Sequence, residues 1–455
     1  MRLSNRSHGR REARTRARGF ALVFLASQLL GASVGLARAN AQEVPERQSL
    51  QELLVRLRQL RDDRLGELRA DVDAVLRAIE IEAQTHHVAG LEDQRKRLVA
   101  LGTEVAPLLV DLIDPGEGAE DPAILRAATV ANALVEQPSP AITARLVEIA
   151  RGGTPPGRLN AVRVLATSPD PKRAGEILAE LSRTAQGELR RAALVGLARM
   201  GGADSAKTLE TSLQSPDPAA VQMTIEALAE ARAAAFAPQV LAIASVTHQV
   251  TPYVSAILAY YRTCPEVVDK AHVQALVRIA GEVSVGNELR ARVLDLLPRF
   301  SEKFDSDVKK ELKQLGTSPT RDIREGALVA LVMAGDRGAH KELLADYDDQ
   351  IDRNKTWPAS YEARANILYR IGEYRDAIRD YQKSLELSAK DFRARTEDSY
   401  IGLARCFAQQ GRLKEASQTL EKAPISRKQL AELAAEPVFQ KVLEHRVFGK
   451  VFRVE

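Results

Sequence analysis

A stretch of fifteen residues occurs twice in this chain, and the repetition constrains the fold more than any single residue does. Residues 188–202 read E-L-R-R-A-A-L-V-G-L-A-R-M-G-G, and residues 322–336, which begin 134 positions later, read D-I-R-E-G-A-L-V-A-L-V-M-A-G-D. The copies share an arginine, an Ala-Leu-Val run, a leucine and a glycine at matching places. Because 134 is close to four times 33.5, the middle of the chain is predicted to repeat one structural unit.

Each unit is predicted to be a pair of helices. In the first copy, apolar residues recur at helical spacing from Leu189 to Met200, and Gly201-Gly202 then ends the helix because glycine tolerates left-handed backbone. A second helix is expected to turn Ala206, Leu209 and Leu213 inward. Comparable helices open 30–35 residues apart, at Leu125, Leu159, Leu189, Val221, Val254, Leu289 and Ile323.

The composition agrees with an all-α fold. Of the 455 residues, 45% are hydrophobic but only 4% are aromatic, and small or unbranched apolar side chains suit closely packed helices. The L-R-R-A-A-L-V-G-L-A-R-M-G run resembles the short, two-helix members of the HEAT repeats, and the resemblance extends over residues 88–349. Ankyrin repeats have a similar period, but no T-P-L-H opening occurs in any copy.

A second repeat type follows an acidic, polar connection predicted over residues 343–356. Residues 358–391 resemble a tetratricopeptide repeat of 34 residues, and a second copy begins near Glu397, so this segment is assigned to residues 357–424. The first copy departs from the family pattern at Arg364, where leucine is usual, and at Ala389, where proline is usual. Residues 425–455 are expected to cap the array with Phe439, Leu443, Val447, Phe448 and Phe452. The predicted fold class is therefore an all-α, helical-hairpin solenoid.

The tetratricopeptide resemblance implies a groove, lined by the first helices of successive copies, that binds peptides or partner helices. The residues at the groove positions are Glu362, Asn366, Tyr369, Arg370, Arg405 and Gln409. The version of the groove that grips a terminal carboxylate has lysine where Glu362 stands, so capture of a C-terminal carboxylate is not expected here. A second interpretation remains, in which the two copies only cap the array.

The first 39 residues have the layout of a secretory signal peptide. A basic leader precedes an apolar run over residues 20–36, and small-x-small sites follow at Ala37-Arg38-Ala39 and Ala39-Asn40-Ala41. An uncleaved membrane anchor is the alternative. These residues hold eight arginines and Glu12, so their removal lowers the formal charge by seven, from +4 to −3. That balance argues against nucleic-acid binding, which depends on neutralising phosphates.

Residues 44–87 are predicted to be a helical region with one apolar stripe. Leu50, Leu53, Leu57 and Leu60 begin the stripe at a spacing of three and four residues. It is expected to pack on the array as an N-terminal cap, and the alternative is a homodimer seam through residues 50–80.

Catalytic and metal-binding motifs are absent from the sequence. It contains no H-E-x-x-H, G-x-S-x-G or phosphate-loop motif, and His86-His87 are interpreted as solvated residues at a helix end. Cys264 and Cys406 are expected to be unpaired and buried. No cofactor or metal is therefore predicted.

Two further patterns each allow two interpretations. One arginine recurs in four copies, as Arg126, Arg190, Arg290 and Arg324. It forms either a ladder of bonds between repeats, which we favour, or an anion-binding ridge. The tyrosine-rich segment 233–261 forms either core, which we favour, or a contact patch.

The sequence thus predicts an exported, non-enzymatic scaffold or adaptor in the cell envelope, in the periplasm of a Gram-negative bacterium or secreted. It would bind a protein or peptide partner and have no membrane span after signal cleavage. Two alternatives remain: an accessory or regulatory subunit of an envelope enzyme complex, and a homodimeric structural protein joined through its N-terminal helices.

Overall fold

The computed structural model describes residues 66–389 and 396–452, and the described residues are helices and turns without a strand. The chain divides into two units, Met1–Leu76 and Arg77–Glu455. Within the first unit only residues 66–76 are described, and they are helical. The predicted signal peptide and the leucines at 50–60 lie outside the described residues, as does most of the predicted dimer seam. No helix among the described residues has the length and apolar character needed to cross a bilayer.

Paired helices fill the second unit up to residue 353. The α-helices are α3 (Val88–Ala100), α4 (Ala106–Leu109), α5 (Asp121–Glu136), α6 (Thr143–Gly152), α7 (Pro155–Leu165), α8 (Pro171–Thr184), α9 (Gly187–Met200), α10 (Ala203–Leu213), α11 (Pro218–Glu230), α12 (Ala237–Ala244), α13 (Val254–Thr263), α14 (Lys270–Gly281), α15 (Asn287–Leu296), α16 (Ser306–Gly316), α17 (Arg321–Met333) and α18 (Arg337–Arg353). Short 3₁₀ helices lie between them: η1 (Thr103–Val105), η2 (Val110–Ile113), η3 (Pro140–Ile142), η4 (Ala234–Phe236), η5 (Thr247–Gln249), η6 (Thr251–Tyr253), η7 (Pro265–Val267) and η8 (Leu297–Lys303).

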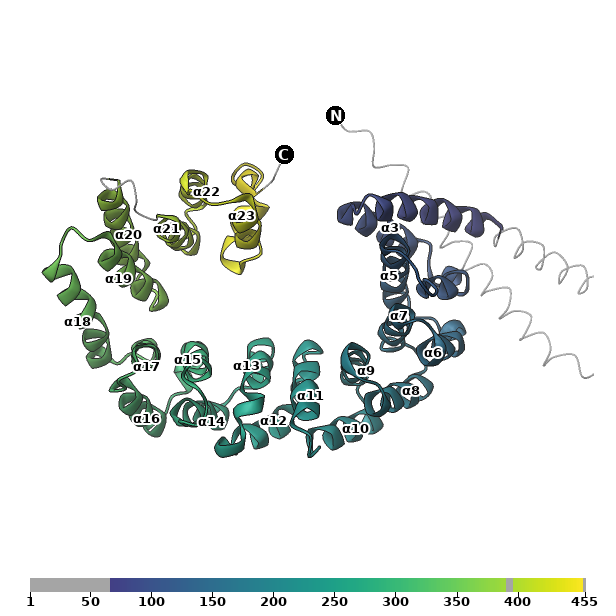
Figure 1. The fold of residues 1–455 in the computed structure, drawn as a ribbon, viewed down its shortest axis with the longest axis horizontal. Coiled ribbons are helices and arrows are strands. Elements are labelled where there is room, and N and C mark those ends of the chain that lie inside the picture. The colour runs from purple at the N-terminus through teal and green to yellow at the C-terminus, as the bar shows by residue number, and fades with distance from the viewer. Residues whose placement is uncertain (1–65, 390–395, 453–455) are drawn as a thin grey trace, which may run out of the picture. The chain divides into compact units, whose positions relative to one another are not determined.

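These helices form two layers. The first helix of each two-helix repeat contacts the first helix of the next one, and we call these helices the odd layer (Figure 1). In chain order they are α5, α7, α9, α11, α13, α15 and α17. The second helices form the even layer, in which α6, α8 and α10 contact in order, as do α12, α14 and α16. Each unit therefore buries its apolar face only against its neighbours, which is the construction of a solenoid.

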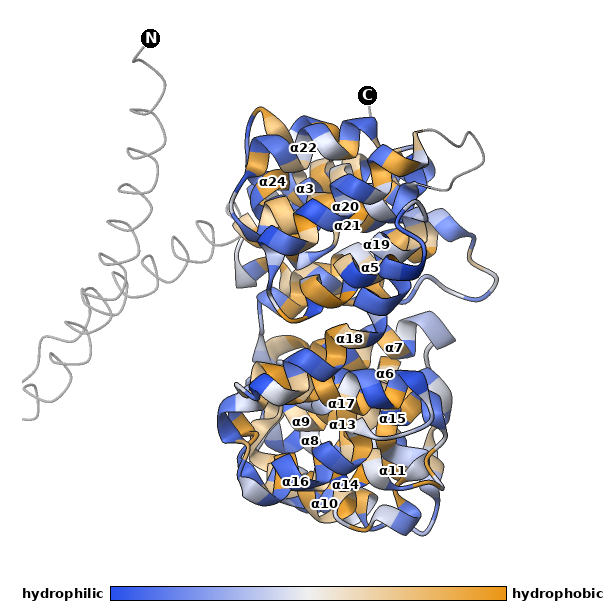
Figure 2. Ribbon diagram, turned by 90° about the vertical axis from the view of Figure 1, so that its left-hand side faces the viewer, coloured by the Kyte–Doolittle hydropathy of each residue, from blue (hydrophilic) through white to orange (hydrophobic). Residues whose placement is uncertain are grey.

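Helix α9 shows how the repeated sequence makes one unit. The buried residues of this helix include Ala193, Leu194 and Leu197. Figure 2 shows that hydrophobic and hydrophilic residues alternate along the helices of the array. Gly201 and Gly202 have φ values of 68° and 85°, so the predicted glycine stop uses the left-handed backbone region that other residues avoid. The second helix, α10, buries Leu209 and Leu213 as expected, whereas Ala206 is only partly covered.

The sequence Ser-Pro-Asp-Pro occurs twice, at residues 168–171 and 215–218, and starts a helix in the same way each time. Asp170 caps α8 by accepting a hydrogen bond from the main-chain N–H of Arg173, and Asp217 caps α11 by accepting one from Ala219. The proline after each aspartate occupies the first helical position, where its missing N–H costs nothing. The turn signals in the sequence therefore mark the true helix starts.

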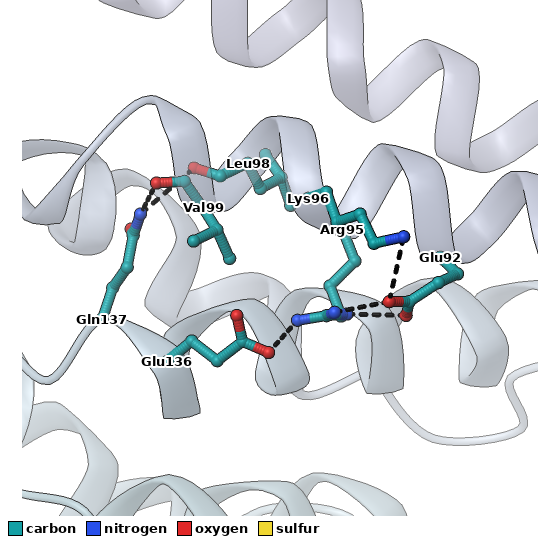
Figure 3. A network of polar contacts seen from close by, with 7 residues as sticks. All are labelled: Glu92, Arg95, Lys96, Leu98, Val99, Glu136 and Gln137. Atoms are coloured by element: carbon teal, nitrogen blue, oxygen red, sulfur yellow. Dashed lines mark hydrogen bonds and ion pairs between the residues drawn. The ribbon is translucent and has the colours of Figure 1, made fainter.

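A polar network joins α3 to α5 at the beginning of the array (Figure 3). The guanidinium of Arg95 donates to Glu92 through Nε at 2.7 Å and through Nη2 at 2.5 Å, and it also pairs with Glu136 of α5. The side-chain amide of Gln137 donates to the main-chain carbonyl of Val99. The Arg95–Glu136 pair and the Gln137–Val99 hydrogen bond each join residues about forty positions apart in the chain. They therefore fix the C-terminal half of α3 against the end of α5.

The predicted connection over residues 343–356 is wrong, because most of it belongs to α18. Asp336 caps this helix of 17 residues by accepting from the main-chain N–H of Ala339. Leu343, Tyr347 and Ile351 recur every four residues and are all buried. This narrow apolar stripe within an acidic stretch is sufficient for a helix that packs on α17 and on the next element, α19 (Pro358–Arg370).

Two helical hairpins follow α18. They are formed by α19 with α20 (Tyr374–Ser388) and by α21 (Glu397–Gln409) with α22 (Leu413–Lys422). The chain then forms α23 (Arg427–Ala434), η9 (Pro437–Phe439), α24 (Gln440–Glu444) and η10 (Phe448–Phe452). Phe439 and Phe452 are buried with their ring centroids 5.8 Å apart, as expected of a cap. Val447 is not part of this core, since 58% of it is exposed; Val442 is buried instead.

Candidate functional site

The predicted groove rests on two hairpins whose helices approach closely. The residues where the helices touch are small, and Ala365, Ala377, Ala404 and Ala416 are completely buried. Gly402 lies against Tyr381 so tightly that a Cβ atom there would be 2.3 Å from a ring carbon. These contacts hold α19, α20 and α21 together, and they place the exposed sides of α19 and α21 next to each other.

All six predicted groove residues lie on α19 and α21. Asn366, Arg370 and Gln409 are exposed, while Glu362, Tyr369 and Arg405 are half-buried. The four positions on α19 are spaced by three or four residues or adjoin, which places them along one side of the helix.

The carboxylate of Glu362 lies at the junction of the two hairpins. It accepts a hydrogen bond from the hydroxyl of Ser399 on α21, and that hydroxyl also lies 3.2 Å from the hydroxyl of Ser384 on α20. Burial raises the pKa of Glu362, and the nearby carboxylates Asp398 and Glu397 raise it further against the opposing effect of the Ser399 bond. Glu362 therefore serves as an acceptor inside the protein.

Two amides and a tyrosine occupy the exposed part of the site. The Oδ1 atom of Asn366 accepts from the hydroxyl of Tyr381 at 2.5 Å, so its NH₂ group remains able to donate. The pKa of Tyr369 is raised, chiefly by burial, while a hydrogen bond with Gln409 and the charge of Arg405 act against the rise. Tyr369 thus connects α19 to α21, and its ring lies 5.6 Å from that of Tyr374.

The two arginines of the predicted set already have carboxylate partners. Arg405 donates to both oxygens of Glu436, at 2.8 and 2.5 Å, and so ties α21 to the segment before η9. Arg370 donates to Asp295 of α15 at 2.6 Å, across 75 residues of sequence. The structure therefore brings five of the six residues together at α19 and α21, and it directs the guanidinium of Arg370 toward the odd layer.

One residue of this segment was recognised only as a departure from the family pattern. Arg364, where leucine is usual, donates to both oxygens of Asp380 on α20 and to Asp348 on α18. It therefore ties the first tetratricopeptide hairpin to the last helix of the HEAT-like array. The signal in the sequence was the charged residue at an apolar position, but Asp348 and Asp380 could not be identified as its partners without the packing.

The recurring arginine of the HEAT-like copies has mainly structural contacts, in agreement with the favoured interpretation. Arg290 donates through Nε to the carbonyl of Ala280, at the end of the preceding helix, at 2.7 Å. Arg324 donates to the carbonyl of Ser318 at 3.1 Å, and Arg126 pairs with Glu80 at 2.8 Å. Arg190 is the exception, because its side chain forms no hydrogen bond or ion pair within the described residues, and its Nε, like that of Arg126, is buried without a partner.

Three other expectations can be compared with the described residues. Cys264 and Cys406 are free and buried, as expected, and burial raises the pKa of both thiols. Tyr260 and Tyr261 are fully buried, so the 233–261 segment contributes to the core. His86 and His87 are exposed at a helix end, and no group of three or more metal-ligating side chains occurs within residues 66–389 and 396–452.

Comparisons with known proteins match two parts of the chain. The family model for HEAT repeats matches residues 143–229, and the model for the tetratricopeptide repeat matches residues 358–423. Both resemblances seen in the sequence are thereby confirmed. A search of curated proteins finds no match.

Solved structures show a general likeness. The crystal structure of Kap121p bound to Nup53p aligns with a TM-score of 0.39 at 14% identity and covers 89% of this chain and 51% of that one. The karyopherin Kap121p bound to the extreme C-terminus of the protein phosphatase Cdc14p aligns with a TM-score of 0.41 at 16% identity, and the alignment covers 89% of this chain and 51% of that one. The UNC-45 chaperone aligns with a TM-score of 0.26 at 13% identity, and the alignment covers 80% of this chain and 57% of that one. This chain spans about half the length of the Kap121p chains that it matches.

The chain is thus a helical solenoid built from two kinds of repeat that typically form non-catalytic surfaces for protein interaction.

Proposed function

We propose that this protein is an exported adaptor that binds an extended segment of a protein partner in the groove of α19 and α21. One observation supports the proposal above the others. The exposed amides of Asn366 and Gln409 stand on the first helices of two successive tetratricopeptide repeats, with Tyr369 between them.

The chemistry of the groove favours recognition of a main chain. A primary amide both donates and accepts, so two such groups match the alternating N–H and C=O groups of an extended peptide. Tyr369 offers an aromatic surface of the kind enriched at interfaces. The two cations among the six groove residues are already neutralised, Arg405 by Glu436 and Arg370 by Asp295, so none of these described residues offers a free cation to a terminal carboxylate.

Export is proposed from the leader in residues 1–39, and the envelope is the compartment that follows from it. The test is N-terminal sequencing of the protein recovered from the producing cell. The expected first residue is Asn40 or Gln42, one for each small-x-small site. Recovery of an intact leader would indicate a membrane anchor, and recovery from the cytoplasm would reject export.

The groove is best tested with substitutions that remove its amide donors while keeping the size of each side chain. Asn366→Asp keeps the oxygen that accepts from Tyr381, and Gln409→Glu removes the donor on α21, which also bonds Tyr369. Arg405→Ala is less suitable because it leaves Glu436 unpaired. Gln382→Glu with Gln440→Glu is the matched control, since it adds the same two charges at exposed positions on α20 and α24.

The measurement is affinity capture from envelope extracts with wild-type, groove-variant and control protein, followed by mass spectrometry. We expect a partner that the wild type and the control retain and the groove variant loses, by roughly tenfold if two hydrogen bonds of the usual net strength disappear. Equal capture by all three proteins would place the binding surface elsewhere and reject the groove.

A further inference from the structure

A cluster of three arginines lies on the odd layer, outside the α19–α21 groove. Arg262 is in the last turn of α13, Arg292 is on α15, and Arg299 is in η8, which continues α15. Helices α13 and α15 pack against each other. Arg262 and Arg299 are exposed and Arg292 is half-buried, so all three guanidinium groups are accessible to solvent.

The α15 part of the cluster lies along one side of the helix. Arg292, Asp295 and Arg299 follow one another at intervals of three and four residues, which aligns them on a helical surface. The residues between them, including Val293, Leu294 and Leu296, are buried and face the core. Packing of the core therefore holds Arg292 and Arg299 on the side of the odd layer that faces solvent.

The cluster has an excess of positive charge. Within the described part of the chain, none of the three arginines forms an ion pair or side-chain hydrogen bond, and Asp295, the carboxylate among them, is bound by Arg370. Burial lowers the pKa of Arg262, and the charges of Arg292 and Arg299 lower it further, while the charge of Asp295 opposes the shift. Arg262 is therefore close enough to both of the other arginines to be repelled by them.

Another part of the odd layer shows the ordinary arrangement. Arg191 and Arg199 on α9 both pair with Glu230 on α11, at 3.0 and 3.8 Å. They line a cleft of about 320 Å³ together with Glu188. Arg191 and Arg199 are thus compensated by a carboxylate of the same chain, whereas Arg262, Arg292 and Arg299 form no ion pair among the described residues. An unpaired cluster on a folded surface is stabilised when a partner supplies the missing negative charge.

We propose that Arg262, Arg292 and Arg299 form a second interaction surface, which binds an acidic segment of a polypeptide partner. The planar guanidinium donates two parallel hydrogen bonds to a carboxylate, so three arginines suit a short run of aspartate and glutamate. Ala259 and Ser255, one and two turns before Arg262, are small and partly exposed, and they leave room for a backbone to approach. The polypeptide is favoured over nucleic acid because three cations in a chain of formal charge −3 without its leader neutralise few phosphates.

The test measures binding of a labelled oligoglutamate peptide of about ten residues to the full-length chain by fluorescence anisotropy. The variant is Arg262→Gln/Arg292→Gln/Arg299→Gln. Its matched control is Arg173→Gln/Arg183→Gln/Lys207→Gln, which removes three exposed cations from α8 and α10 of the even layer. Duplex DNA of similar charge and vesicles containing anionic lipid are the competing probes. Thermal unfolding of every variant shows whether it is folded.

We expect the wild type and the control to bind the peptide and the cluster variant to bind it roughly tenfold more weakly, the combined effect of three exposed ion pairs. Asn366→Asp/Gln409→Glu should leave this binding unchanged, which separates the surface from the groove. Three results would overturn the proposal: no binding of the peptide by wild type, equal loss in cluster variant and control, or preferred binding of DNA or vesicles through the same arginines.

Discussion

Arg364 binds the carboxylate of Asp380 through two parallel hydrogen bonds, from Nε at 2.7 Å and from Nη2 at 2.8 Å. Asp380 is buried, with 6% of it exposed, and the third contact of the guanidinium reaches Asp348 on α18 at 2.8 Å. The pair occupies a position where tetratricopeptide repeats usually have leucine. A buried bidentate pair has thus replaced an apolar contact at the junction of the two repeat types.

Replacing Arg364 with leucine, the usual residue of the family, is expected to destabilise this chain. Arg364→Leu would leave Asp380 buried without its partner, at a cost of about 2–4 kcal/mol, somewhat less than for a fully buried pair because a quarter of the arginine side chain is exposed. Chemical denaturation measures the loss, and hydrogen exchange should locate it in α19 and α20.

The double variant Arg364→Leu/Asp380→Leu is the control for that prediction. Because an apolar pair can replace a buried ion pair at little cost, it should recover most of the lost stability. A double variant that is as unstable as the single one would show that the charge pair itself is not what Arg364 contributes.

Gly402→Ala is expected to destabilise the second hairpin. The added Cβ would be 2.3 Å from the Tyr381 ring, which is itself buried, so α20 and α21 would have to separate at a cost of about 1–3 kcal/mol. Gly175→Ala in α8 is the contrasting variant. Its Cβ would have only the sulfur of Met200 nearby, at 3.5 Å, and it should raise the unfolding free energy by up to about 1 kcal/mol through helix propensity. Equal effects of the two variants would contradict the packing.

Cys406 is expected to make stability depend on alkaline pH. Burial raises the pKa of its thiol to about 12 from 9.0, so the unfolded chain releases this proton at lower pH than the folded chain does. The contribution of the protonated Cys406 thiol to the free energy of unfolding is complete below about pH 9. It is lost as pH rises from there toward 12, by about 1.4 kcal/mol per pH unit. Denaturant titrations of wild type and Cys406→Ala check this. The difference between them should shrink across that window, and a constant difference would contradict it.

Two arginines at the same repeat position are expected to differ in what they contribute. Arg290→Met removes a buried donor from the carbonyl of Ala280 and should cost about 1–3 kcal/mol, because that carbonyl lies at a helix end with few alternatives. Arg190→Met removes an Nε that has no partner and should cost less than about 0.5 kcal/mol. Thermal unfolding of the two variants gives the comparison, and similar losses would show that the ladder contacts are not the cause.

The sequence was sufficient to predict which helices carry the candidate groove residues, but not which of the charged residues are paired with each other. The register of the tetratricopeptide pattern placed Glu362, Asn366 and Gln409 correctly on α19 and α21, because register within one helix follows from sequence spacing. That Arg405 is bound by Glu436 could not be predicted, since the pairing depends on how the C-terminal segment packs. The acidic stretch after Leu343 was misassigned because three apolar residues in a polar background form too narrow a stripe to be read without the neighbouring helix.

The sequence by itself determined that this protein contains a stack of two-helix units and a tetratricopeptide segment, and that glycines such as Gly201 stop helices. These features follow from the helical period and from backbone conformation, both of which act between residues close in the chain. The tertiary structure alone decided that Arg364 joins α18 to α20 and that Arg370 binds Asp295. It also decided that Arg262, Arg292 and Arg299 form no ion pair with any carboxylate of the described residues. Those contacts depend on the angle and register between helices, which the spacing of residues within each helix does not specify.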